Sequence, residues 1–505
     1  MKTSTWRFAT SDLGVLLWLA FGGVILHTLL NGQYGFHRDE LDILMNARQL
    51  AWGYVAYPPL TPFIARIGLE LFGSSLVGLR LFSAIGQGVV MFLTGLMARD
   101  LGGKRPAQVM AALAVFIAPV ALTAGTLIQY MAFDYVWWVM IAFFTVRLLK
   151  TDDARSWLGI GAGIGLGMMT KYTLAFWVAG LAVAILLTSA RRYLRSPWLW
   201  AGAGLALLIY APNLLWQIQQ RFVSLEFLNA IHARDIAWGR TTAFWPEQLY
   251  VSTNPFTLPL WVMGLVWCLF SSAGKRFRAL GLMFLTTLAL LALNRGRAYY
   301  VGPAYAMLLA AGAAWLEGWL QPRATWVRRT GKGLAWALLI VGSVVGVVLI
   351  KPVAPINSEL WKTTSGVNGE VVEMIGWQDL TAQVAGVYAK LSADDKSRAV
   401  ILAGNYGEAG ALDFYGVSYG LPRIISGANS LWERGYGDPE PETVIVVGFE
   451  RGYADSFFRS CEYAGQVTNR YGVKNEESKF HTGLYVCREA RQPWAEMWKT
   501  MRWFQ

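Results

Sequence analysis

Two adjacent carboxylates stand in a charged segment that follows the first long apolar stretch of the chain. Asp39 and Glu40 lie between Arg38 and Asp42, in the sequence YGFHRDELDILMNARQLAWG. A carboxylate beside a reacting hydroxyl can accept its proton, so the pair is a candidate for general-base chemistry. The alternative is an ordinary solvated loop, and these residues alone do not decide between the two.

Three further segments place charges beside apolar helices, where a charge is costly unless it is paired or functional. Asp134 lies within QYMAFDYVWWVMIAFF, and Lys171 lies within MMTKYTLAF. The third segment, LNRGRAYYVGP, carries Arg295, Arg297, Tyr299 and Tyr300. Together with Asp39, these segments supply carboxylates and cations from four separate parts of the chain.

Transfer of a group from a phosphate is the chemistry that suits this set. One carboxylate takes the proton of the attacking hydroxyl, and the cations neutralise the charge that develops on the departing phosphate. A glycosidase would instead need a second, protonated carboxyl group. We therefore predict Asp39 as the base, Glu40 as the group that orients it or holds the acceptor, and Lys171 and Arg297 as phosphate partners. In the structural alternative, Asp134 pairs with one of the cations and only joins helices.

Other motif classes fit the sequence less well. The four histidines lack the spacing of metal ligands, so we predict no His/Cys metal site. GAGIGLG at 161–167 has no preceding strand, which favours helix packing through small residues over nucleotide binding. AGNYGEAG at 403–410 is typical of a strand-turn-helix joint. It is either an ordinary turn or a helix N-terminus that meets an anionic or sugar acceptor.

Composition shows what must position these residues. The chain has 505 residues, 55% of them hydrophobic and 15% charged, with a mean hydropathy of +0.38, which is too apolar for one soluble core. Many apolar runs approach the roughly 18 to 20 residues that cross a bilayer as a helix. About eleven spans are predicted, near 12–30, 76–98, 106–122, 132–149, 156–169, 172–189, 197–215, 253–271, 279–293, 301–319 and 334–351.

The charge pattern orients these spans. Residues 1–352 hold 29 Lys and Arg against 13 Asp and Glu, whereas residues 353–505 hold 15 against 19. The excess of basic residues falls in short loops near 99–105, 147–155, 191–195, 275–278 and 323–332, as the positive-inside rule expects of cytoplasmic loops. This distribution excludes a nucleic-acid-binding surface. It also places Asp39, Asp134, Lys171 and Arg297 toward the outer side.

The segment 31–75 is predicted to lie outside the membrane and to carry the catalytic motif. Residues 38–50 have apolar positions at helical spacing and suit a helix in the membrane interface. AYPPLTP then breaks the helix. The substrate-facing residues that we assign to this segment are His37, Arg38, Tyr57, Pro58 and Pro59.

The tail from residue 353 differs from the membrane part. AVILAG (399–404) and TVIVVGF (443–449) are typical of buried strands, GEAGALDFYG of a helix, and residues 370–391 have helical periodicity. We expect an α/β domain that spans 353–505, on the periplasmic side. An oxidising compartment would permit a disulfide between Cys461 and Cys487, whereas Cys268 falls in a span.

Several of these motifs occur together in a known family. GFHRDELDILMNARQLAWGYVAYPPLTPFIARIG, MTKYTLAFW, NRGRAYYVGPAYAMLLAAGA and NYGEAGALDFYG resemble segments of bacterial membrane glycosyltransferases of family 39, relatives of protein O-mannosyltransferases and lipid A aminoarabinose transferases. The resemblance runs along nearly the whole chain. It implies a GT-C fold, a polyprenyl-phosphate sugar donor, inversion at the anomeric carbon, and a place in the bacterial inner membrane.

The resemblance also implies residue roles. The acidic residue of the first external loop, the catalytic base in that family, corresponds to Asp39, and a second acid near a later span corresponds to Asp134. Aminoarabinose transferases carry a lysine before the proline turn as a phosphate ligand, where this chain has Tyr57, so phosphate binding is expected on Lys171 and Arg297. No cofactor is expected to be required, although a divalent cation near Asp39 is compatible with the family.

The predicted reaction moves a sugar from a polyprenyl-phosphate donor to an envelope lipid, glycan or protein, with membrane lipids around the enzyme. One alternative is a polyprenyl-linked lipid flippase or transporter, which predicts broken helices and charges near the middle of the membrane. Another is an assembly or ligand-binding protein whose tail is the active module.

Overall fold

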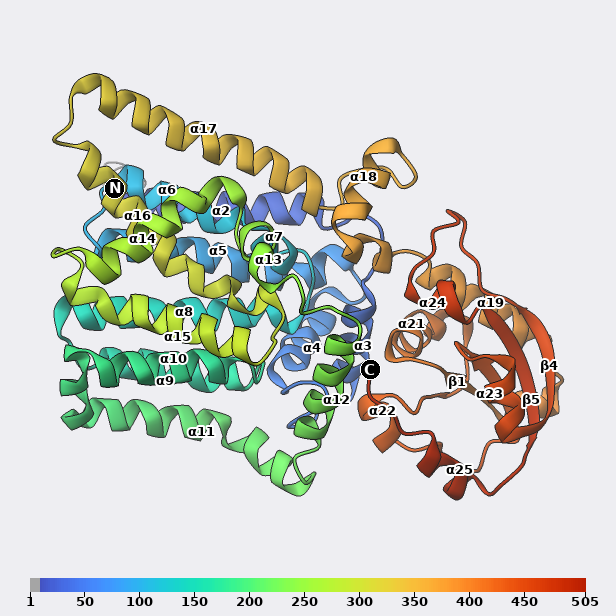
Figure 1. The fold of residues 1–505 in the computed structure, drawn as a ribbon. Helices are drawn as coiled ribbons and strands as arrows, with labels where there is room; N and C mark the ends of the chain where they lie inside the picture. The colour runs from blue at the N-terminus through green and yellow to red at the C-terminus, as the bar shows by residue number, and fades with distance from the viewer. Residues whose placement is uncertain (1–9) are drawn as a thin grey trace, which may run out of the picture.

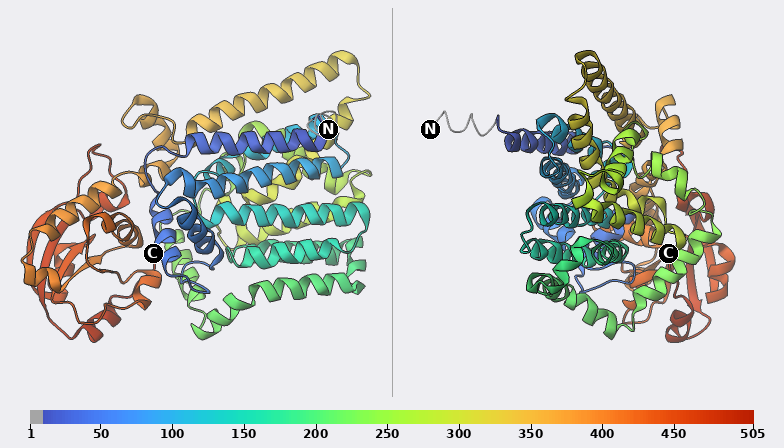
Figure 2. Two further views of the ribbon diagram at one scale, coloured as in Figure 1. Left: turned by 180° about the vertical axis from the view of Figure 1, so that it is seen from behind. Right: turned by 60° about the vertical axis from the view of Figure 1, so that its left-hand side comes forward.

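The computed structural model describes residues 10–505, and its larger part is a bundle of helices (Figure 1). Their apolar sequences suit this form, because a helix satisfies all its backbone groups internally and can therefore lie in lipid. The helices that run along the bundle are α2 (Asp12–Leu30), α5 (Leu76–Asp100), α6 (Arg105–Phe116), α8 (Tyr130–Thr151), α9 (Ser156–Met168), α10 (Leu174–Leu187), α11 (Pro197–Gln219), α14 (Leu258–Phe270), α15 (Arg278–Leu293), α16 (Tyr305–Leu320) and α17 (Thr325–Ile350) (Figures 1 and 2).

Length and composition separate these helices into two groups. Within residues 10–505, six helical segments are long and apolar enough to cross a membrane, or up to eight spans if each of two bent pairs counts as one. The predicted span 106–122 is broken, because Pro119 opens a separate short helix, α7 (Pro119–Ala124), after α6 ends at Phe116. The multi-pass character is clear, and the number eleven stays a prediction.

The basic loops meet at one end of the bundle. Lys150 Nζ lies 3.0 Å from Asp100 Oδ1, and Arg276 Nη2 lies 2.6 Å from Asp152 Oδ2. These pairs join the end of α5 to the end of α8, and the end of α8 to the turn before α15. The loops therefore share one side, as the charge pattern predicts.

Small residues let neighbouring helices approach closely. A side chain added at Gly161 of α9 would place its Cβ 2.1 Å from the carbonyl oxygen of Gly202 in α11, so this crossing needs glycine. Gly161 is the first residue of the GAGIGLG segment, whose glycines lie within α9. The segment packs helices, as its sequence favours.

The opposite end of the bundle carries α3 (Arg38–Arg48), α4 (Leu60–Phe72), α12 (Val223–Ala237) and α13 (Phe244–Tyr250) (Figure 1). The predicted helix over the catalytic motif is present as α3. It does not lie open in an interface, because Leu41, Ile43 and Leu44 are all fully buried. The tail covers it: an added Cβ at Gly410 would come within 2.7 Å of the Leu41 backbone.

The tail forms a five-stranded sheet in the order β2-β1-β3-β5-β4. β1 (Ala399–Ala403) and β3 (Thr443–Val447) fall where strands are predicted, pair in parallel, and are buried along their whole length. β2 (Ile424–Ile425) extends this parallel part, and β4 (Phe458–Gln466) and β5 (Gly483–Ala490) add an antiparallel hairpin. A parallel sheet of apolar strands needs cover on both faces.

Helices supply that cover. α19 (Trp377–Ala389) and α21 (Tyr406–Gly416) occupy the two stretches with predicted helical periodicity. The others are α18 (Glu359–Val367), α20 (Ala393–Ser397), α22 (Asn429–Glu433), α23 (Arg451–Phe457), α24 (Glu476–Phe480) and α25 (Trp494–Thr500). α21 lies between the sheet and α3, so the tail meets the bundle at the catalytic motif (Figure 1).

Cys461 of β4 and Cys487 of β5 face each other in register and form a disulfide, as the sequence allowed. The bond closes a loop across a sequence separation of 26 residues. Replacing both cysteines by serine should lower the free energy of unfolding of the tail by about 2–4 kcal/mol, because the unfolded chain regains loop entropy. Denaturant titration of the purified protein measures the change, and a loss of less than about 0.5 kcal/mol would contradict this account.

Candidate active site

Asp39 sits in the first turn of α3, where the local sequence fixes it. The His37 ring caps the helix and accepts a hydrogen bond through Nδ1 from the Asp39 backbone N–H at 3.1 Å, and the Glu40 carboxylate accepts one from the His37 backbone N–H at 2.8 Å. This capping box sets the direction of the helix. As a result, the Asp39 carboxylate points out of the helix with 23% of its side chain exposed.

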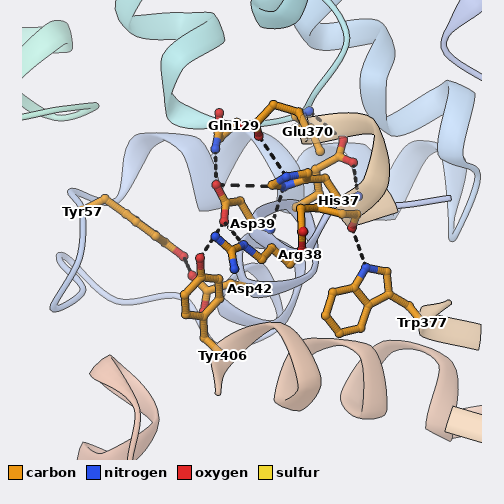
Figure 3. A network of polar contacts seen from close by, with 12 residues as sticks. His37, Arg38, Asp39, Asp42, Tyr57, Gln129, Glu370, Trp377 and Tyr406 are labelled. Atoms are coloured by element: carbon orange, nitrogen blue, oxygen red, sulfur yellow. Dashed lines mark hydrogen bonds and ion pairs between the residues drawn. The ribbon is translucent and has the colours of Figure 1, made fainter. Parts of the chain in front are cut away.

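Two neutral donors hold the Asp39 carboxylate from either side (Figure 3). The Gln129 amide donates to Oδ2, and the Tyr406 hydroxyl donates to Oδ1 at 2.8 Å. Gln129 precedes α8, and Tyr406 opens α21 in the tail. The carboxylate is thus oriented by two distant segments, while its nearest cation, Arg38, stays 3.8 Å away.

The His37 ring is held on its other side by a tail residue. Its Nε2 lies 3.0 Å from Oε2 of Glu370. Desolvation acts to raise the pKa of Glu370, but the hydrogen bond from His37 and the charges of His37, Arg38 and Arg297 together outweigh it and lower this pKa to about 2. His37 therefore acts here as a linker between α3 and the tail, and it is not among the residues that line the cavity described below.

Glu40 faces away from Asp39 and is fully buried. Arg80 of α5 binds it through Nε at 2.9 Å and Nη2 at 2.6 Å, and the Ile128 backbone N–H donates to Oε1 at 2.8 Å. Such a paired, enclosed carboxylate has no room to hold an acceptor. The structure leaves Glu40 a positioning role, since it fixes the start of α3.

Asp42 and Tyr57 form a second polar pair beside Asp39 (Figure 3). The Tyr57 hydroxyl donates to Asp42, and the Asn46 amide lies 2.6 Å from the Tyr57 oxygen. Burial raises the pKa of Asp42 to about 6, although the bond from Tyr57 opposes the shift. Tyr57, which is predicted to face the substrate, lines the cavity described below. Pro58 lies beside it in the cavity wall, whereas Pro59 caps α4 and does not line the cavity.

Lys171 lies in the turn between α9 and α10, and its side chain projects into a cluster of tyrosine rings. Its Nζ lies 5.1, 5.0 and 4.3 Å from the ring centroids of Tyr130, Tyr299 and Tyr300. Within residues 10–505, no hydrogen bond or ion pair engages this ammonium. Three π faces stabilise the cation while its N–H donors stay available to a ligand.

Asp134, the second acid predicted for the site, does not form the direct pair with a cation that the structural alternative requires. It is buried one turn inside α8 and accepts a hydrogen bond from Trp138 Nε1 at 3.0 Å. Among the described residues, no basic nitrogen lies within 4 Å of its carboxylate. Asp134 is also absent from the cavity wall, so its predicted catalytic role stays a prediction.

Arg297 has a partner that the sequence analysis missed. Its Nε and Nη2 each lie 2.6 Å from a carboxylate oxygen of Asp235 in α12. Arg295, two residues earlier, is exposed and adopts a φ of +47°, which turns the loop at the end of α15. Both arginines line the same cavity as Lys171, and only Arg297 is tied to a carboxylate.

One cavity of about 430 Å³ collects these groups, a volume that suits a small ligand. Its wall comes from α3, the segments before α8 and α10, α12, and the 3₁₀ helix η4 (Ala298–Ala304). The polar residues that matter in it are Asp39, Asp42, Tyr57, Lys171, Asp235, Arg295, Arg297, Tyr299, Tyr300 and Tyr406. A carboxylate thus shares one cavity with an unpaired ammonium.

Across the described part of the chain, no three His, Cys, Asp or Glu side chains are grouped as metal ligands. This absence concerns only the ligands that the protein's own side chains would supply. Whether the reaction needs a divalent cation therefore stays a prediction.

Comparison with known proteins fits this geometry. The family model described as dolichyl-phosphate-mannose-protein mannosyltransferase matches residues 56–216. The undecaprenyl phosphate-alpha-4-amino-4-deoxy-L-arabinose arabinosyl transferase 1 of Pseudomonas fluorescens is 30% identical over 206 residues, and the match covers 39% of this chain and 34% of that protein. Lipid A galacturonosyltransferase RgtD of Rhizobium johnstonii is 27% identical over 206 residues, covering 40% and 41%. In sequence, the chain thus spans about a third of the length of the first of these relatives and two fifths of the second.

The solved structures decide the fold. The crystal structure of ArnT from Cupriavidus metallidurans bound to undecaprenyl phosphate superposes with a TM-score of 0.57 at 15% identity, over 94% of this chain and 98% of that one. The chain has the GT-C fold. The predicted fold class, a helical membrane part followed by a small α/β domain, is confirmed, as is the resemblance to glycosyltransferases of family 39. In this GT-C fold, Asp39 lies at the junction of the two parts.

Tyr406 tests whether the tail takes part in the site. Tyr406→Phe keeps the ring but removes the hydroxyl that bonds Asp39, so we expect turnover to fall about tenfold, as for the loss of one hydrogen bond to a charged group. Thermal stability should stay near that of the wild type. Tyr463→Phe, on an exposed tyrosine of β4, is the matched control. Equal turnover in both variants would show that Tyr406 does not position the carboxylate.

Proposed function

We propose that this protein is an inverting glycosyltransferase that moves one sugar from a polyprenyl-phosphate donor to an envelope acceptor on the periplasmic face of a bacterial inner membrane. The observation that carries the proposal is the shared cavity of Asp39 and the unpaired Lys171. The names of the sequence relatives support it, since they describe transfer from undecaprenyl phosphate and transfer to lipid A.

The reaction divides between the two sides of the cavity. Asp39 accepts the proton of the acceptor hydroxyl as that oxygen attacks the anomeric carbon. The bond from this carbon to the phosphate oxygen breaks, and polyprenyl phosphate leaves with the electron pair. A single displacement of this kind inverts the anomeric centre. Gln129 and Tyr406 aim the Asp39 carboxylate, because both donate to its oxygens.

Lys171 is the principal phosphate partner in this proposal. An ammonium aimed at the leaving group stabilises the charge that develops there without needing to reorganise. Arg295 supplies a second charge from the rim. Arg297 belongs to a cluster in which Asp235 also pairs with Arg234 at 3.5 Å and Arg240 at 3.8 Å, so one carboxylate meets three cations and the cluster stays positive. Tyr299 and Tyr300 then hold Lys171 in place, and Asp134 balances its charge from inside the helix layer.

The acceptor is an envelope lipid, glycan or protein, and the tail stands on its side of the membrane. Lys and Arg gather at the far end of the bundle, which favours that end as the cytoplasmic one. The flippase alternative predicts broken helices, which the structure has at Pro119 and in two bent helix pairs, and charges near the middle of the membrane. The cavity charges cluster at one end of the helices instead, beside α3 and the tail, and this supports transfer over transport.

The test is a transfer assay with the purified protein in detergent. A polyprenyl-phosphate sugar with a radiolabelled sugar is incubated with envelope lipids and glycans, and both the labelled product and the released polyprenyl phosphate are followed. We expect equal amounts of the two. Flux of the labelled lipid across proteoliposomes with no product would contradict the proposal and favour transport. Mass spectrometry of envelope glycans from strains with and without the gene then identifies the acceptor.

A further inference from the structure

A second cavity of about 500 Å³ lies between the C-terminal end of α3 and the tail. It shares no lining residue with the first cavity. Its wall includes Gln49 just beyond α3, Asp413 and Val417 around the end of α21, Arg423 beside β2, and Arg434 after α22. Val417 and Arg423 are exposed, so the cavity opens to solvent.

The charge balance in this cavity is positive. Asp413 is the one acid in its wall, and Arg48 neutralises it at 2.9 Å. In the described part of the chain, no ion pair engages Arg423 or Arg434. The Arg423 guanidinium packs so closely on Gly437, which has a φ of +107°, that an added Cβ would lie 1.9 Å from Nη1. The Arg423 guanidinium thus lies against the loop that follows Arg434.

Arg434 connects the second cavity to the first. Its Nη2 donates to Oδ1 of Asn46, and the Asn46 amide in turn contacts the Tyr57 hydroxyl at 2.6 Å and Asp42 Oδ1 at 3.3 Å. Asp42 and Tyr57 line the first cavity. Asp39, Asp42 and Asn46 lie on one face of α3. The seven-residue rise of the helix from Asp39 to Asn46 separates these two residues by about 10 Å.

We propose that the second cavity binds a phosphorylated sugar unit of the acceptor, with the phosphate between Arg423 and Arg434. Guanidinium groups match phosphate oxygens with paired N–H donors, and the volume suits a small polar ligand. Leu412, Leu421 and Leu431 give the wall an apolar side against which a sugar ring can pack. Only the acceptor role rests on the proposed function. The binding of a sugar phosphate does not depend on it.

The experiment is a calorimetric titration of the full-length protein with glucose 1-phosphate, and with methyl glucoside as the uncharged probe. Arg423→Gln should lower the affinity for glucose 1-phosphate about tenfold, as for one charge-assisted hydrogen bond. Arg459→Gln removes an exposed arginine of β4 outside the cavity and should bind as the wild type does. Val417→Trp, at an exposed position of the wall, should block binding without touching a charge.

Three outcomes would overturn the proposal: no binding to the wild type, equal affinity for the charged and uncharged probes, or an equal loss in Arg423→Gln and Arg459→Gln. A phosphorylated glycolipid in micelles separates the two sources of this chemistry. Tighter binding of the glycolipid supports a lipid acceptor, and equal binding supports a glycan. Release of polyprenyl phosphate from the donor, measured separately, reports on the first cavity. Failure of the proposed transferase activity would therefore be distinguishable from failure of this site.

Discussion

Asp39→Asn is expected to lower the rate of sugar transfer by a factor of about 10² to 10⁴, the usual contribution of a general base. The asparagine amide has the same shape but cannot accept the proton of the acceptor hydroxyl. Tyr406 and Gln129 can still surround it, so the fold and the affinity for the polyprenyl-phosphate donor should change little. The effect should therefore appear in turnover and not in donor binding.

The comparison needs three measurements on each variant: transfer rate, donor binding, and thermal unfolding in detergent. Asp455→Asn, on the half-exposed aspartate of α23, removes a carboxylate far from the cavity and serves as the control. If Asp39→Asn stays folded, binds the donor and turns over at the wild-type rate, the base lies elsewhere and the proposed mechanism is wrong.

Arg80→Met is expected to produce the largest loss of stability, about 3–5 kcal/mol in the free energy of unfolding, because it leaves the Glu40 carboxylate buried without its cation. Both side chains of this pair are fully buried. Arg80 also donates to the backbone oxygens of Asn31 at 2.9 Å and Gly35 at 2.8 Å, which ties down the segment that leads into α3.

A double-mutant cycle separates the ion pair from these other contacts. The double variant Arg80→Met with Glu40→Gln should recover part of the loss, since it no longer buries an unpaired charge. Arg66→Met breaks the exposed Arg66–Glu70 pair of α4 and should cost at most about 1 kcal/mol. Urea titration in detergent of the wild type, Arg80→Met, Glu40→Gln, the double variant and Arg66→Met gives the values. A loss below about 1 kcal/mol in Arg80→Met would mean that the pair does not anchor α3.

The sequence was sufficient for features that depend on local chemistry. The segment after the first apolar span has apolar positions at helical spacing, and it forms the helix α3. The apolar runs at 399–404 and 443–449 have the composition of buried strands, and they are β1 and β3. The positive charge of the short loops predicted which loops lie together at one end of the bundle.

Partners that come from distant segments could not be predicted in the same way. Glu40 looks like a second catalytic acid until Arg80, near the start of the apolar helix α5, is seen to neutralise it. Arg297 looks like a free phosphate ligand until α12 brings Asp235 to it. Tyr406 lies in the NYGEAG motif, which did carry a signal, because an acceptor-facing helix start was one of its two interpretations. No residue pattern around Tyr406 in the sequence indicates that its hydroxyl contacts Asp39.

The docking of α21 on α3 has a consequence for biogenesis. Domains generally fold in the order in which they are synthesised, from the N-terminus onward. Lys171 and Asp39 are thus in the membrane before Tyr406 has been made. Until the tail arrives, the carboxylate lacks one of its two donors and His37 lacks Glu370. A nascent chain would hold a cavity that can admit a lipid-linked sugar, but the Asp39 carboxylate would not yet be oriented. Completion of the tail is therefore the step that supplies the Tyr406 hydroxyl to Asp39 and the Glu370 carboxylate to His37.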